Sequence, residues 1–500
     1  MRFLSRFLDR VHAALTGPAR ERNVVLALAA YVVLWTAYGT IAKSSQGLHY
    51  DMTEVIAWSR DLSFGYLKHP PLAAFVAWLW FGVFPVAEWS FYLLAMLMPA
   101  IALWFAWRIS ADYLDAEKRV AGLALLMLVP FFNFHALKFN VNTVLMPLWA
   151  ATTVWFLRSY VTRSTVYAVL AGLGAAACMM GKYWSVFLLA GLIVVALLDA
   201  RRWQYFKSTA PWITAGIGLL ALGPHLIWLK QHDFAPFGYA MTLHGAKPFV
   251  STLKGVVGYF GGSLGYIAVP LIVTAVLVRR SATRAGDILW PSDRERRLAA
   301  TAFWAPLVLP ALGALASGTE ITSLWSMPAW TLLAVVLLSP PKLQVTAIDT
   351  RRGIIAATAL PLVMLIASPF IAIMVQRDGP RPAAAHAQLL AMEIERLWHQ
   401  ATPQPLRFVD GDAEIAYDVV AAASERPRAL PNMDPPGADV LRRAGVAIVC
   451  FGDDGNCKAA AAARAAAVPR AQRIETEIVR NYLRIAGKPR RYSITLVPPS

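Results

Sequence analysis

Ionisable side chains crowd one short stretch of an otherwise apolar chain. Asp51 and Glu54 stand three residues apart in "HYDMTEVIAWSRDL", and "GYLKHPPL" follows with Tyr66, Lys68 and His69. If the first part is helical, the two carboxylates share one face of the helix. A carboxylate can take a proton from a hydroxyl, and a lysine next to a histidine can bind a phosphate. The alternative is a hydrated amphipathic helix whose acids simply face water.

Other candidates lie at the ends of later apolar segments. They are Lys138 with Asn142, Lys182 with Tyr183, and His244 with Lys247 in the loop 230–254. Glu320 and Trp325 at a later turn are similar cases. Charged groups at a membrane edge are costly, which makes each a candidate for substrate binding. The alternatives are that the lysines extend to lipid headgroups and that the loop histidine is merely solvated.

The composition is that of a membrane protein. Of the 500 residues, 57% are hydrophobic and 15% are charged, which is too little charge for the surface of a soluble enzyme of this length. The net charge of +17 could suggest a nucleic-acid partner, but the basic residues stand in small groups between apolar runs. Such groups follow the positive-inside pattern, so we expect membrane lipids as partners and no nucleic acid.

The apolar segments predict a protein that crosses the membrane many times. A spanning helix needs about 20 mainly apolar residues. We predict eleven spans: 24–42, 90–108, 119–134, 143–158, 165–180, 184–199, 211–229, 255–278, 298–315, 324–339 and 353–375. With the N-terminus inside, the inner connections carry most of the basic residues, which supports this count independently. The stretch 72–84 is too short to span and is expected in the outer interface, so residues 43–89 form one external loop.

The two ends of the chain differ from its apolar middle, the predicted membrane domain 23–376. Residues 1–22 place apolar and basic side chains on opposite helical faces, which predicts an amphipathic helix on the cytoplasmic membrane surface. The segment after it lacks a small-residue cleavage site and is interpreted as an uncleaved anchor. Residues 377–500 alternate helix-like and strand-like runs, which predicts a small periplasmic α/β domain. There, Cys450 and Cys457 could form a disulfide. The expected fold class is therefore mainly α, a polytopic membrane protein with a small C-terminal α/β domain.

Several motifs together resemble a known enzyme family. "GYLKHPPL" after an acidic helix, with "FNVNTVLMPLW", "GKYWS", "GPHLIWL" and "TSLWSMPAW", is similar to the bacterial glycosyltransferase family 39 and related GT-C enzymes. The likeness covers roughly residues 20–340 and is greatest to the protein mannosyltransferase-like group, which includes lipid A aminoarabinose and rhizobial galacturonic acid transferases. The family usually has adjacent Asp and Glu in this loop. Here Met52 follows Asp51, and the next acid is Glu54.

The resemblance implies an activity and roles for single residues. It implies a GT-C fold and transfer of a sugar from a polyprenyl-phosphate donor to a lipid, glycan or protein acceptor. The reaction is expected at the periplasmic face of a bacterial inner membrane, with inversion at the anomeric carbon. Asp51 is the implied catalytic base and Glu54 its assistant or a metal-facing partner. The residues expected to bind the donor phosphate or substrate are Tyr66, Lys68, His69, Lys138, Asn142, Lys182, Tyr183, His244 and Lys247.

Two other functions fit parts of the sequence. A transporter or flippase of lipid-linked sugars would also be polytopic, but its polar residues should lie at the bilayer midplane in broken helices. An assembly protein that uses the membrane part only as an anchor would need a single span. The sequence has no closely spaced metal motif and no glycine-rich nucleotide loop. We therefore expect no obligatory cofactor, although Asp51, Glu54, His69 and His244 could converge on a divalent metal.

Overall fold

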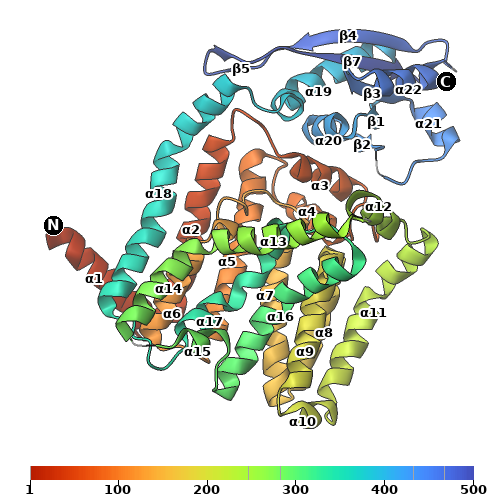
Figure 1. Ribbon diagram of the computed structural model, residues 1–500. Helices are drawn as coiled ribbons and strands as arrows, with labels where there is room; N and C mark the ends of the chain where they lie inside the picture. The colour runs from red at the N-terminus through yellow and green to blue at the C-terminus, as the bar shows by residue number, and fades with distance from the viewer. Residues whose placement is uncertain (1, 246, 282, 432, 467, 500) are drawn as a thin grey trace. The chain divides into compact units, whose positions relative to one another are not determined.

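Helices make up most of the chain in the computed structural model (Figure 1). The structure describes residues 2–245, 247–281, 283–431, 433–466 and 468–499, without the side chains of residues 2–5. The chain forms two compact units. The first holds Met1–Thr36 and Leu93–Met364, and the second holds Ala37–Tyr92 and Leu365–Ser500. The mainly α class predicted from the sequence is confirmed.

The first unit is built from helices throughout its described residues. Three of them, α2, α5 and α18, continue into the second unit. The α-helices are α1 (Arg2–Thr16), α2 (Arg20–Ala42), α5 (Glu88–Ser110), α6 (Ala116–Met127), α7 (Val141–Thr162), α8 (Thr165–Gly181), α9 (Val186–Leu198), α10 (Arg202–Phe206), α11 (Ala210–Gln231), α12 (Ala235–His244), α13 (Phe249–Tyr266), α14 (Ala268–Ser281), α15 (Ala285–Leu289), α16 (Arg294–Ser317), α17 (Leu333–Leu338) and α18 (Ala347–Asp378). Short 3-10 helices are η1 (Pro130–Phe132), η2 (Tyr183–Ser185) and η3 (Ser323–Leu332).

Five helices are long and apolar enough to cross a membrane, namely α2, α5, α11, α16 and α18. The pair α13 and α14 gives a sixth candidate, bent by 67°. Shorter apolar helices cover Leu72–Phe81, Thr165–Gly181, Tyr183–Leu198 and Ser323–Leu338. Every predicted span falls on helical structure. Length and composition support five or six spans within the described residues, so the count of eleven stays a prediction.

Small residues let neighbouring helices of the first unit approach closely. A Cβ on Gly172 of α8 would lie 2.6 Å from the carbonyl oxygen of Thr214 on α11. A Cβ on Gly191 of α9 would lie 2.9 Å from the ring of Pro306 on α16. In a lipid environment the hydrophobic effect does not drive apolar helices together, so they associate through such close packing. The glycines therefore allow α8 to pack closely on α11, and α9 on α16.

The second unit combines two short helices from the region 50–81 with an α/β fold. Its helices are α3 (Tyr50–Arg60), α4 (Leu72–Phe81), α19 (Pro382–Ala401), α20 (Ala413–Ala422), α21 (Ala438–Ala444) and α22 (Gly455–Ala465). Its strands are β1 (Phe408–Gly411), β2 (Arg428–Ala429), β3 (Val446–Phe451), β4 (Gln472–Ile478), β5 (Asn481–Tyr482), β6 (Ile485–Ala486) and β7 (Arg490–Val497). Five strands form one sheet in the order β2-β1-β3-β7-β4, and β5 pairs with β6. The helix and strand alternation predicted for the C-terminal region is thus observed.

The core of this unit joins α3 to the C-terminal fold. Ala57 of α3 is buried in the same apolar cluster as Trp398 of α19 and Val419 of α20. The rings of Tyr50 and Tyr417 lie 5.7 Å apart. A disulfide between Cys450 and Cys457 ties β3 to α22, with the Cα atoms 5.8 Å apart. The helix α3 is therefore held by buried contacts from residues more than 300 positions away in the chain.

Candidate active site

The first acidic stretch is a short helix that is buried over most of its length. The side chain of His49 caps its start by accepting a hydrogen bond from the amide of Asp51 at 3.1 Å. Every residue from Met52 to Ser59 is buried. The predicted helix is therefore confirmed as α3, and it is rigidly packed.

Glu54 points into a closed polar cluster. It is only 3% exposed. Its Oε1 accepts a hydrogen bond from Nζ of Lys68 at 2.9 Å and one from the hydroxyl of Tyr50 at 3.3 Å. The ammonium of Lys68 also lies 4.8 Å from the centre of the Tyr50 ring. The alternative of a hydrated helix whose acids face water is therefore wrong for Glu54.

Burial also changes the acidity of this carboxyl. Loss of water around Glu54 raises its pKa from 4.5 to about 7, although Lys68 and Tyr50 act in the opposite direction. The charge of Asp51 raises the pKa further. A carboxyl with a pKa near neutrality can both hold and release a proton under working conditions. Glu54 is therefore suited to store a proton, but it is not open to a bulky substrate.

Asp51 is the accessible carboxylate of the pair. Its side chain is 30% exposed, and its Oδ1 lies 3.7 Å from Nδ1 of His49. It stands in the first turn of α3, where the backbone amides and the helix dipole favour a negative charge. Of the two acids predicted from the sequence, the structure thus leaves Asp51 partly accessible and buries Glu54.

The loop after α3 is fixed by aromatic packing. The ring of Tyr66 stacks on Trp58 with centroids 4.8 Å apart. Its hydroxyl lies 3.0 Å from the carbonyl oxygen of Trp58 and 3.1 Å from that of Asp61, so it can donate to either. The amide of Tyr66 donates to the carbonyl of His69 at 3.0 Å. Tyr66 therefore shapes the loop, while the half-buried imidazole of His69 stands at its edge, 6.1 Å from Trp58 between ring centres.

A second polar cluster lies in the first unit, around Trp325 of η3. Asn140 caps α7 by accepting hydrogen bonds from the amides of Asn142 and Thr143. The cap orients Asn142, whose Oδ1 accepts a hydrogen bond from Nζ of Lys182 at 2.9 Å. The ammonium of Lys182 lies 4.7 Å from the centre of the Trp325 ring. Two residues predicted separately thus form one contact at the ends of α7 and α8.

His244 and Lys247 join the same cluster. The ring of His244 meets Trp325 edge to face at 5.1 Å. Two backbone hydrogen bonds, from Lys247 to Gly318 and from Glu320 to His244, tie the two loops together at 2.9 Å each. Burial lowers the pKa of His244, the charge of Glu320 raises it, and the charges of Lys182 and Lys247 lower it. The carboxylate of Glu320 lies 4.0 Å from Nζ of Lys247, so Lys182 is the cation of this cluster best placed to bind an anion.

The last two predicted substrate residues have other contacts. The hydroxyl of Tyr183 lies 3.1 Å from Nε2 of His225, and its ring packs on Phe237 at 4.8 Å. The carbonyl of Lys138 accepts a hydrogen bond from the hydroxyl of Thr143 at 2.6 Å, and its side chain is half-buried. The roles predicted for Lys138 and Tyr183 in binding substrate stay predictions.

The predicted site residues thus fall into two groups, one in each unit. Asp51, Glu54 and His69 belong to the second unit, whereas His244 belongs to the first. Within the described part of the chain, no three His, Cys, Asp or Glu side chains gather as metal ligands. Sequence reasoning missed Tyr50, although its place four residues before Glu54 is a helical contact spacing.

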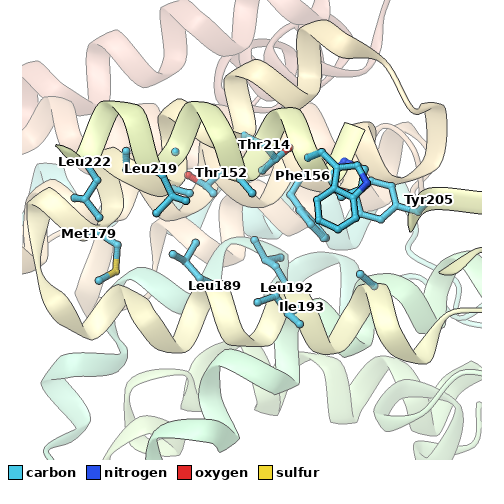
Figure 2. A pocket seen from close by; sticks show the side chains of 18 of the residues that line it. Thr152, Phe156, Met179, Leu189, Leu192, Ile193, Tyr205, Thr214, Leu219 and Leu222 are labelled. Atoms are coloured by element: carbon cyan, nitrogen blue, oxygen red, sulfur yellow. The ribbon is translucent and has the colours of Figure 1, made fainter. Parts of the chain in front are cut away.

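An apolar pocket of about 580 Å³ lies between helices of the first unit (Figure 2). Its walls come from α7, α8, α9, α10 and α11. The labelled side chains that surround it are Thr152, Phe156, Met179, Leu189, Leu192, Ile193, Tyr205, Thr214, Leu219 and Leu222. The accessible wall of the pocket is almost wholly apolar, so the pocket suits an acyl or isoprenoid chain.

Part of the chain matches a family model, and most of it is similar to two curated proteins. Residues 68–228 match the family model described as dolichyl-phosphate-mannose-protein mannosyltransferase. The lipopolysaccharide core galacturonosyltransferase RgtB of Rhizobium johnstonii is 26% identical over 353 residues, which is 68% of this chain and 69% of RgtB. RgtA of the same organism is 24% identical over 436 residues, which is 82% of this chain and 83% of RgtA.

Solved structures show the same fold. ArnT from Cupriavidus metallidurans in the apo state aligns over 94% of this chain and 97% of ArnT, with a TM-score of 0.59 and 12% identity. ArnT bound to undecaprenyl phosphate aligns over the same shares with a TM-score of 0.56. The resemblance inferred from the sequence motifs is thus confirmed.

Proposed function

We propose that this chain, which has the fold of ArnT and is similar to two galacturonosyltransferases, moves a sugar from a polyprenyl-phosphate carrier to a hydroxyl of a lipid-anchored glycan. The observation that carries the proposal is the pair of carboxylates on α3, with Asp51 accessible and Glu54 buried against Lys68. Transfer to a hydroxyl acceptor needs an accessible base, and buried contacts must hold that base in a fixed position. The relatives named as lipopolysaccharide core galacturonosyltransferases support galacturonic acid as the sugar and a lipopolysaccharide core as the acceptor.

In the proposed reaction, the acceptor oxygen attacks the anomeric carbon of the donor sugar. Asp51 takes the hydroxyl proton as the new carbon–oxygen bond forms. The bond from the anomeric carbon to the phosphate oxygen breaks, and polyprenyl phosphate leaves with that electron pair. Attack opposite the leaving group inverts the anomeric carbon. Glu54 and Lys68 keep α3 and the following loop in place, so that Asp51 stays at the surface.

We propose that the cations around Trp325 form an anion-binding site of the first unit, suited to the phosphate group of the lipid donor. Charged donors make strong hydrogen bonds to phosphate oxygens. Lys182 and Lys247 bring two positive charges, of which that of Lys247 is paired with Glu320 at 4.0 Å, and the His244 ring packs on the same indole. ArnT is a structural relative that was solved with undecaprenyl phosphate bound. That finding supports a lipid phosphate as the anion, and the apolar pocket of the first unit would take part of its chain.

The proposed location is a bacterial inner membrane, crossed eleven times, with both polar clusters and the α/β fold in the periplasm. The disulfide between Cys450 and Cys457 supports an oxidising compartment for the C-terminal fold. We further propose that catalysis needs no metal, which the donor screen tests with EDTA.

A donor screen tests the function directly. The protein, reconstituted in vesicles with lipopolysaccharide core acceptor, is incubated with radiolabelled undecaprenyl-phosphate sugars, galacturonic acid among them. We expect label in the acceptor and release of undecaprenyl phosphate, unchanged by EDTA. Failure to convert any lipid-linked donor would contradict the proposal. Movement of the donor across the vesicle bilayer without transfer would instead favour a flippase.

A further inference from the structure

A second cleft, of about 850 Å³, lies within the second unit. Polar and apolar atoms share its walls. Its polar lining comes from Ser44, Thr53, Glu88, Gln388, Asp418, Arg480 and Asn481. This volume falls in the range of small-molecule binding sites. None of these residues is used by the reaction proposed above.

A buried carboxylate lines this cleft. Asp418 of α20 is 1% exposed, and neither of its oxygens accepts a hydrogen bond from the described residues. The hydroxyl of Thr53 lies beside it but donates its hydrogen to the carbonyl of Tyr50 at 3.0 Å. Burial raises the pKa of Asp418 to about 7. A buried polar group without a partner is costly, so a ligand that offers hydrogen-bond donors would be stabilised here.

The charges of the cleft argue against an anionic ligand. Its one arginine, Arg480, is already held by the carbonyls of Ser44 and Ser45 at 2.6 and 2.9 Å. Two acids, Glu88 and Asp418, line the same cleft. These carboxyl groups, whose pKa values burial raises, offset the single positive charge of Arg480, so the cleft offers a phosphate or carboxylate little net attraction. A neutral ligand with many hydroxyl groups does not depend on such attraction.

Apolar side chains stand between the polar groups. Leu48, Val86 and Leu389 line the cleft together with several alanines. A sugar ring presents hydroxyl groups at its edge and carbon–hydrogen bonds on its faces, so it needs both kinds of wall. The mixed lining therefore fits a saccharide better than a hydrocarbon chain.

The helix α3 connects this cleft with the candidate active site. Thr53 follows Asp51 by two residues, which turns it about 200° around the helix axis. The two side chains therefore point to nearly opposite sides of α3. Gly47 and Leu48, which also line the cleft, lead directly into the first turn of α3, where Asp51 stands. A ligand longer than one ring could pass around this end of the helix.

We propose that the cleft beside Asp418 binds a neutral saccharide unit of the acceptor glycan, while the neighbouring unit presents its hydroxyl to Asp51. The inference rests on the proposed function, because it takes the acceptor to be a glycan. It assigns acceptor recognition to α19, α20 and the start of α3.

Binding of a delipidated core oligosaccharide tests this inference without any donor. Isothermal titration of the full-length protein in detergent is compared with that of Ala421→Phe, which fills the cleft from α20. Asp418→Asn tests the carboxylate with little change of shape, and Ala463→Phe on the exposed face of α22 is the matched control. We expect Kd to rise by at least about tenfold in Ala421→Phe and severalfold in Asp418→Asn, with the control unchanged.

The outcomes separate the inference from the proposed function. Unchanged affinity in Ala421→Phe, or an equal loss in Ala463→Phe, would overturn the saccharide site. Thermal melting of each variant confirms that it is folded before titration. Since no donor is present, loss of this site would leave the transfer reaction standing. Binding of the oligosaccharide without any transfer in the donor screen would count against the proposed function alone.

Discussion

Replacing Glu54 by glutamine should remove a specific pH dependence of folding. Burial raises the pKa of Glu54 from 4.5 to about 7, so the folded protein holds this proton more tightly than the unfolded chain does. The resulting stabilisation is fully present below about pH 4.5 and is lost as the pH rises through about 7. Each pH unit is worth 1.36 kcal/mol, so the shift amounts to about 3 kcal/mol.

The amide in Glu54→Gln does not titrate, so the variant lacks this loss. The free energy of unfolding of the variant minus that of the wild type should therefore rise by about 3 kcal/mol between about pH 4 and pH 8. For folding units of 150–250 residues, such a change in the free energy of unfolding shifts the melting temperature by about 6 to 12 °C. The assay is the melting temperature in detergent, followed by tryptophan fluorescence across this pH range.

The matched control is Asp439→Asn, whose carboxylate is 73% exposed. It should track the wild type at every pH. If the difference in melting temperature between Glu54→Gln and the wild type stayed constant with pH, the argument that burial raises the pKa of Glu54 would be refuted.

Three further predictions concern other parts of the molecule. Lys182→Met should raise the KM for the lipid-linked donor by about 10- to 100-fold, since a charged hydrogen bond is worth about 1.5–3 kcal/mol; it should also raise the pKa of His244 in NMR titrations, and an unchanged KM would contradict the phosphate site. Gly411→Ala should lower the free energy of unfolding by at least about 2 kcal/mol, because φ is +115° and a Cβ would collide with the carbonyl of Val449; a wild-type melting temperature would refute this. Cys457→Ser should lower the free energy of unfolding by about 2–3 kcal/mol, because it opens the short loop that the disulfide to Cys450 closes. If reducing agent left the melting temperature of the wild type unchanged, the disulfide would be contradicted.

The sequence was most informative where local spacing decides the outcome. The helical pattern around Asp51 predicted α3, and the three-residue spacing placed Glu54 on the same side. The sequence could not predict the burial of Glu54, because α3 is buried largely by α20, which follows more than 300 residues later. Nor could it tell which acid is accessible, since that depends on Lys68 and Tyr50 closing over one of them.

The cluster around Trp325 shows the same limit. Lys182 and His244 were each predicted from their positions at the ends of apolar segments. Their meeting at one indole ring depends on the close packing of α8 against its neighbours, which no local pattern contains. The number of spans is hard to predict for a different reason. Bent helices such as α13 and α14 meet the length and hydropathy criteria for a membrane span only when the two are counted together.

The assignment of Asp51 as the base is the central claim. Single-turnover transfer from undecaprenyl-phosphate galacturonic acid is measured for the wild type, Asp51→Asn and Asp51→Glu, with donor binding measured in parallel. We expect Asp51→Asn to slow transfer by about 10²- to 10⁴-fold with unchanged donor Kd, and Asp51→Glu to recover part of the rate. Transfer by Asp51→Asn at the rate of the wild type would contradict the claim.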